Sequence, residues 1–267
     1  MEHVLMLILI YLVLGACAGV IFGTLGVGGG LLIVPGLAWI FRLEHFPSDV
    51  VMHMAVGTSL AIMIISTIRA IIAHRRYETE FWSIYRRMLI GIIIGVVGGG
   101  VLGHFLHSRM IAILFGAFVL LMSIGMFFMK SIDPKRQLPG NVSMGIVGVI
   151  AGILSGLLGI GGGVITIPYL TYCNVKMRQS LLISIATALT VSLFGTLTVM
   201  ITGMYTPDLP AWSTGYVYWP AWLGASLGTV FSVPLGVKLS YRLPIPVLKH
   251  VFAVFLLLIG VHLLFSH

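Results

Sequence analysis

The sequence is short of charge. Only 8% of its 267 residues are Asp, Glu, Lys or Arg, while 59% are hydrophobic. A water-soluble domain usually carries about 25% charged residues, so this chain cannot cover itself with a soluble surface. Apolar runs recur from end to end and leave no stretch for a sizeable soluble domain. The composition therefore predicts an all-α polytopic membrane protein.

Carboxylates are missing from the apolar runs. The acidic residues all fall in a terminus or in a polar connection: Glu2, Glu44, Asp49, Glu78, Glu80, Asp133 and Asp208. Acidic side chains inside a membrane are the usual relays for protons and cations. Their absence argues against a carboxylate-coupled pump and against a cation pathway.

Several other functional signatures are also lacking. Cys17 and Cys173 are too few for a disulfide framework or a zinc site, and we expect no metal and no other cofactor. The apolar segments contain no paired carboxylates, no His-Glu-x-x-His and no Ser elbow, so the chain is not predicted to be an enzyme. The net charge of +8 is not clustered on a soluble face, which argues against a nucleic-acid partner. The expected partners are the lipid bilayer and a small anion, and the sequence leaves open a homodimer.

Ten apolar segments follow one another along the chain. They run roughly over residues 4–22, 29–41, 50–73, 87–106, 110–129, 143–158, 163–173, 180–203, 217–237 and 246–265. The second and seventh are too short to cross about 30 Å of hydrocarbon at about 1.5 Å per residue. We therefore expect broken or re-entrant helices at these two places.

An internal repeat organises the segments. Residues 23–35 carry the pattern Gly-x-x-Gly-x-Gly-Gly-Gly-x-x-x-x-Pro, and residues 156–168 carry it again, 133 positions later. The repeat predicts a first transmembrane half over 1–130, a cytoplasmic linker over 131–142 and a second half over 143–267. Pro35 and Pro168 should bend or end the short helices.

The distribution of Lys and Arg predicts the topology. With ten segments, one set of alternate connections carries Arg75, Arg76, Arg86, Arg87, Lys130, Lys135, Arg136, Lys176, Arg178, Lys238 and Arg242, and the other carries only Arg42 and Arg109. The richer side should be cytoplasmic, which places both termini outside the inner (plasma) membrane. If each glycine-linked pair is one kinked crossing, the bias disappears. Since each half has an odd number of segments, the second half should be inverted relative to the first.

The glycine runs are the main candidate site. Glycine backbone can take positive φ and approach a ligand closely, and the start of a short helix presents unpaired N–H groups that attract anions. Two inverted loops facing each other would form one midplane pocket. The alternative is close helix packing, which is our reading for Gly91, Gly95, Gly99 and Gly103. The predicted substrate-binding glycines are Gly26, Gly28, Gly29, Gly30, Gly159, Gly161, Gly162 and Gly163.

Hydroxyl and basic side chains could complete the site. Residues 57–60 match residues 186–189, and in these stretches Thr58, Ser59 and Thr187 could donate to an anion or could bond to the preceding helical turn. Thr190, His53 and Arg69 are weaker pathway candidates, and Arg69 could instead snorkel to the headgroups. The aromatic residues between 205 and 222 read as an interfacial belt on the outer side.

The paired glycine motifs resemble those of the sulfite exporter TauE/SafE family, a large group of membrane anion transporters, and the resemblance covers nearly the whole chain. It implies transport of sulfite, sulfoacetate or related organosulfonates, with export from the cell. From the inverted halves we expect this transport to proceed by alternating access around the shared pocket. The resemblance also implies that residues 26–30 and 159–163, with Thr58 and Thr187, face the substrate. Two alternatives stay open: an importer of carboxylates or other anions with the same fold, and a membrane assembly subunit that transports nothing.

Overall fold

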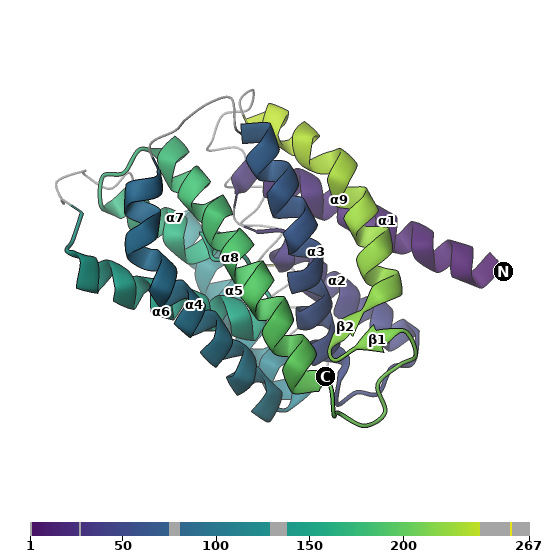
Figure 1. Ribbon diagram of the computed structural model, residues 1–267. Coiled ribbons are helices and arrows are strands. Elements are labelled where there is room, and N and C mark those ends of the chain that lie inside the picture. The colour runs from purple at the N-terminus through teal and green to yellow at the C-terminus, as the bar shows by residue number, and fades with distance from the viewer. Residues whose placement is uncertain (1, 27, 75–80, 129–137, 241–256, 258–267) are drawn as a thin grey trace.

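A computed structural model describes residues 2–26, 28–74, 81–128, 138–240 and 257 (Figure 1). The described part is helical apart from one short hairpin, which confirms the all-α prediction. Six helices are long and apolar enough to cross a membrane. The predicted segment 246–265 lies outside the described residues apart from residue 257. The elements are α1 Glu2–Leu25, α2 Gly30–Leu43, α3 Val51–His74, α4 Trp82–Phe105, α5 Ser108–Phe128, α6 Asn141–Leu158, α7 Gly163–Tyr172, α8 Met177–Gly203, β1 Ser213–Thr214, β2 Val217–Tyr218 and α9 Trp219–Ser240.

The glycine runs break the helices where the sequence predicted. The chain leaves helical structure between α1 and α2 and again between α6 and α7. The prolines do not end the short helices, since α2 continues past Pro35 and α7 past Pro168. At 14 and 10 residues, these helices are about 21 and 15 Å long, too short to span the hydrocarbon.

Glycines on one face of α4 serve helix packing, as predicted. A Cβ atom on Gly91, Gly95 or Gly99 would lie only 2.2–2.3 Å from a carbonyl oxygen of α6. Gly228 and Gly236 of α9 face the carbonyls of α1 in the same way, at 2.2 and 2.3 Å. The backbones of α4 and α6, and those of α1 and α9, therefore touch along their lengths.

In these two contacts, the fourth helix of each half of the sequence packs against the first helix of the other half. The fourth helix of the first half, α4, packs on the first helix of the second, and α9 packs on α1. The fold is thus built from two groups. We call α1, α2, α3 and α9 the α9 group, and α4, α6, α7 and α8 the α4 group. The most extensive contact between the groups lies between α3 and α8.

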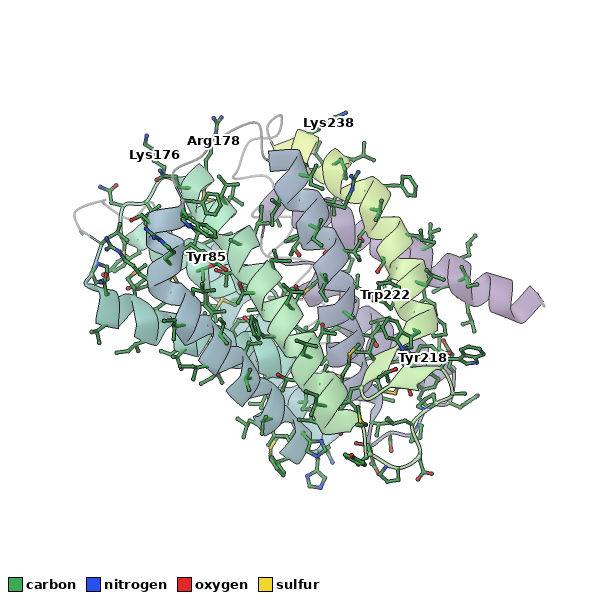
Figure 2. The ribbon with its side chains drawn as sticks, viewed as in Figure 1. Tyr85, Lys176, Arg178, Tyr218, Trp222 and Lys238 are labelled. Carbon is green, nitrogen blue, oxygen red and sulfur yellow. The ribbon has the colours of Figure 1, made fainter. Side chains whose placement is uncertain are left out.

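The helices α8 and α9 run in opposite directions (Figure 2), and the inversion of the second half relative to the first stays a prediction. Figure 1 shows α4, α8, α3 and α9 side by side in that order, and their mutual contacts agree. In Figure 2, Lys176 and Arg178 at the start of α8 lie at the same end as Lys238, near the end of α9. We call this the basic end, and the opposite end, where Tyr218 lies, the hairpin end. The charge count predicted that these three residues share a side; which side faces the cytoplasm stays a prediction.

The β1–β2 hairpin is an insertion into the fold rather than an aromatic belt. Its strands pair antiparallel, with Ser213 opposite Tyr218. Trp212 and Tyr205 are 80% and 91% exposed, as a belt requires, but Tyr216 is only 4% exposed and Val217 is fully buried. The belt prediction is therefore wrong for Tyr216, which lies in the turn between the two strands. The second strand next to it packs against α3, α8 and α9.

Candidate functional site

The two glycine loops need glycine for their backbone conformation. Gly26 has φ +65°, Gly28 has φ +94° and Gly159 has φ +67°. These values lie in the left-handed region, which side chains with a Cβ rarely adopt. Gly159 also ends α6 as its left-handed cap, so the helix break and the loop geometry have the same cause.

The loops cross each other in direct backbone contact. A Cβ on Gly28 would lie 2.6 Å from both the Cα and the N of Gly161, and one on Gly30 would lie 2.1 Å from the carbonyl oxygen of Gly159. All eight predicted substrate-binding glycines are buried. The structure therefore brings the two loops together as predicted. Since Gly28 and Gly161 touch, this conformation is closed between them.

Each glycine loop is hydrogen-bonded to one serine from the opposite half of the sequence. Ser59 on α3 donates its hydroxyl to the carbonyl of Gly159 at 3.1 Å, and Ser184 on α8 donates to the carbonyl of Gly26 at 2.5 Å. Both serines are fully buried. The repeat comparison matched Ser59 with Ala188, so it missed Ser184, which lies one helical turn earlier. Ser59 thus holds the loop, and its proton is committed to a carbonyl.

Each short helix starts with N–H groups that can receive an anion. The carbonyls of Gly29 and Gly162 accept the third and fourth N–H groups of α2 and α7 at 3.0–3.2 Å. The earlier N–H groups of Gly30, Gly163 and Val164 have no hydrogen-bond partner among the described residues. With the positive end of the helix dipole, such groups favour a negative ligand.

The three predicted threonines differ in their contacts. Thr187 is fully buried, its methyl lies 2.5 Å from where a Cβ on Gly162 would be, and its hydroxyl has no partner among the described residues. Thr58 accepts the N–H of Tyr218 at 3.0 Å. The hydroxyl of Thr190 lies 2.5 Å from that of Tyr85 and 3.2 Å from the carbonyl oxygen of Ala186, so it already has partners within the protein. Of the three, Thr187 alone combines a place beside a glycine loop with an unused donor.

Arg69 does not merely extend to the headgroups. Its Nε donates to the carbonyl of Val230 on α9 at 3.2 Å. Pro234 lies four residues further along α9 and has no N–H, so it leaves this carbonyl without its helical partner. Arg69 therefore supplies the hydrogen bond that Pro234 cannot give to this carbonyl. The sequence could not reveal this contact, because Arg69 and Pro234 lie on different helices.

His53 lies at the hairpin end and caps the end of α4. Its Nε2 lies 3.1 Å from the carbonyl oxygen of Gly103 and 3.0 Å from that of Leu106, so Nε2 must carry a proton and donate. Among the described residues, no three of His, Cys, Asp and Glu come close enough together to hold a metal ion.

The hairpin end holds a carboxylate closer to the core than expected. Glu44, just after α2, is half-buried and accepts a hydrogen bond from the hydroxyl of Tyr11, which is 1% exposed. Tyr218 packs edge-on against Phe41 and Phe46. Burial, and then the nearby Glu44 carboxylate, raise the pKa of Tyr218, so its phenol stays neutral.

Buried helix breaks that meet inside a bundle of membrane-length helices define an integral membrane protein of the transporter type. Inside a membrane, backbone groups that lack a helical hydrogen bond must be buried by protein or must bind a polar ligand. In the described part of this chain the two glycine loops are buried by protein and also keep N–H donors that a ligand could use.

Comparisons with known proteins agree with this class. The family model described as "Sulfite exporter TauE/SafE" matches residues 11–263. The chain is 30% identical over 259 residues to a probable membrane transporter protein of Haemophilus influenzae, covering 96% of this chain and 97% of that one. It is 28% identical to one of Methanocaldococcus jannaschii, covering 90% and 88% of the two chains. The chain belongs to the sulfite exporter TauE/SafE family, a family of membrane transporters.

Proposed function

We propose that this protein carries a small anion out of the cell across the inner membrane, and that the anion is sulfite, sulfoacetate or another organosulfonate. The crossing of the two glycine loops carries the proposal. Among the described residues, N–H groups of α2 and α7 and the hydroxyl of Thr187 have no hydrogen-bond partner, and the residues that carry them are buried beside the crossing. All of these groups are donors, which suit an anion.

The proposed motion is a rocking of the α9 group against the α4 group. Within each group, one pair of helices, α1 with α9 or α4 with α6, packs backbone to backbone along a glycine face. The other helices of the group pack against that pair, so each group should move as one body. Between the groups, α3 meets α8 and the loops meet at Gly28 and Gly161. Parting the groups would open the loops to one side of the membrane at a time, which is alternating access. The moving bodies are therefore mixed, and each takes its fourth helix from the other half of the sequence.

Export is favoured by the membrane potential. A monoanion that leaves a cell with a negative interior gains about 2.3 kcal/mol per 100 mV. Outward movement thus needs no coupled cation, which agrees with the absence of acidic residues from the apolar runs. Import against this potential would need a separate source of energy.

The substitution Thr187→Val tests the central site. It removes a hydroxyl that has no protein partner among the described residues and keeps the side-chain volume, so folding should be unaffected. If the hydroxyl donates to the anion, its loss should raise the KM for sulfoacetate about 10- to 100-fold, since a hydrogen bond to a charged group contributes about 1.5–3 kcal/mol. The measurement is efflux of radiolabelled sulfoacetate from proteoliposomes.

Thr196→Val is the matched control. Thr196 is on the same helix, is 5% exposed and also has an unpartnered hydroxyl in the described part of the chain. Equal KM values for the two variants would refute Thr187 as a ligand. A panel of sulfite, sulfoacetate, taurine, thiosulfate and carboxylates would identify the substrate class, and a preference for carboxylates would favour the other-anion alternative. If the protein moves none of these anions above empty liposomes, transport itself is refuted and an assembly role gains support.

A further inference from the structure

A small cavity lies on the hairpin side of the crossed loops. It is lined by His53 and Val56 of α3, His104 of α4, Leu157 of α6, Val199 of α8 and Tyr216 of the hairpin. It therefore lies at the boundary between the α9 group and the α4 group. In this closed form it has room for about one water molecule.

The cavity adjoins the candidate site. The Cα of Val56 lies 3.0 Å from where a Cβ on Gly159 would be, so one wall of the cavity is also the support of the second loop. Gly156 and Leu157, which line the cavity, immediately precede that loop. An anion that leaves the loops toward the hairpin end would enter this space first.

The cavity wall is mostly apolar, and the polar side chains that line it in the described structure are those of His53, His104 and Tyr216. The hydroxyl of Tyr216 accepts from Thr206 at 3.0 Å and lies 2.9 Å from Nδ1 of His104. When Nδ1 donates to that oxygen, the proton of Tyr216 is free to donate to a ligand. No acidic residue is among the described residues that line the cavity.

His53 hydrogen-bonds to carbonyl oxygens that would otherwise repel an anion at the cavity. The carbonyls at the end of α4 carry the negative end of the helix dipole. Nε2 of His53 binds two of them, those of Gly103 and Leu106. Its ring also stacks on Tyr216, with ring centres 5.0 Å apart. His53 is thus a positioning residue that masks these carbonyls and orients Tyr216.

The backbone of Tyr216 closes the cavity. A Cβ on Gly57 of α3 would lie 2.5 Å from the carbonyl oxygen of Tyr216, and one on Gly203 of α8 would lie 2.7 Å from its N. The hairpin is therefore wedged between one helix of each group. When the groups part, at least one of these two contacts must open.

We propose that this cavity is the exit subsite for the transported anion, and that Tyr216 both closes it and supplies its hydrogen-bond donor. The inference rests on the proposed function and names a second anion site on the same path. The ligand class is a small oxyanion or sulfonate. Tyr216 leaves with the hairpin as the α9 group and the α4 group separate.

Thiol labelling tests the subsite independently of flux. In a full chain with Cys17→Ala and Cys173→Ala, the substitution Val199→Cys places a reporter in the cavity wall. The rate of its reaction with a membrane-impermeant maleimide is measured in sealed vesicles of either orientation. Tyr216→Phe keeps the ring and removes the hydroxyl, and should speed labelling from the hairpin side about tenfold, the effect of losing about one net hydrogen bond from the closed form. Tyr205→Phe, at a 91% exposed position, is the matched control.

The second measurement is the protection of the reporter cysteine from labelling by a bound anion. Sulfoacetate should slow labelling of the Val199→Cys reporter when Tyr216 is intact and much less after Tyr216→Phe, while glycerol should not protect. If Tyr216→Phe folds poorly, Thr206→Val removes one donor of the same cluster with a smaller change. Equal labelling rates in the Tyr216→Phe and Tyr205→Phe proteins, or protection that does not depend on the hydroxyl, would overturn the subsite. Intact flux with these results would refute only the subsite, whereas absent flux in the unchanged protein would refute the proposed function.

Discussion

Adding one methyl group at the loop crossing should destabilise the closed protein. The Cβ of Gly161→Ala would lie 2.9 Å from the Cα of Gly28, 3.0 Å from the terminal carbon of Met63 and 3.2 Å from the Cβ of Ala188. Met63 can turn away, but the backbone of Gly28 cannot move without moving its loop. Gly161 has no positive φ, so the effect is one of contact rather than of backbone strain. Overpacking of this kind costs about 1–3 kcal/mol.

The matched control for this prediction is Gly98→Ala. A Cβ there meets nothing within 4 Å, and Gly98 lies inside α4, so the change should stabilise by about 0.5–1 kcal/mol. The free energies of unfolding of both purified variants are measured by denaturant titration in mixed micelles. The two should differ by about 1.5–4 kcal/mol. If Gly161→Ala is as stable as Gly98→Ala, the loops do not touch at this point and the closed crossing is refuted.

Three further changes test other contacts. Arg69→Met should cost about 1.5–3 kcal/mol of unfolding free energy in the natural background but much less with Pro234→Ala, which restores an N–H to the same carbonyl; equal costs in a double-mutant cycle would contradict the capping role. Ser59→Ala and Ser184→Ala should each destabilise by about 1 kcal/mol, and a thermal-shift assay that shows no change for either would refute the loop ties. Thr58→Val should cost about 1–3 kcal/mol, because it leaves a hairpin N–H without its acceptor, and faster protease cleavage of the hairpin in intact vesicles would report it.

The helix breaks could be predicted from the sequence because they follow from local chemistry. Three consecutive glycines weaken a helix wherever they stand, and the hydrocarbon thickness shows that the segments beside them are too short to span. The packing face of α4 could also be predicted, because spacing by four residues places Gly91, Gly95 and Gly99 on one side of a helix. Each of these features can be inferred from the residues of a single segment.

The contacts that involve two segments could not be predicted in the same way. Ser184 was missed because the spacing between the loop and the serine differs in the two halves. Ser59 follows Gly26 by 33 residues, whereas Ser184 follows Gly159 by 25, which a fixed alignment cannot show. The aromatic stretch was misread because belt residues and hairpin residues have the same composition. What separates Tyr216 from Trp212 is the space left by Gly57 of α3, which is remote in sequence, and by Gly203 at the end of α8.

The exchange of fourth helices between the halves has a consequence for biosynthesis. The ribosome makes α1 first, yet the helix whose backbone it contacts, α9, follows all the other described helices in the chain. Until α9 is inserted, the glycine face of α1 must be covered by lipid or by another membrane protein. A nascent chain that stops before α9 therefore presents an uncovered packing face, by which membrane quality control could recognise it as unfinished.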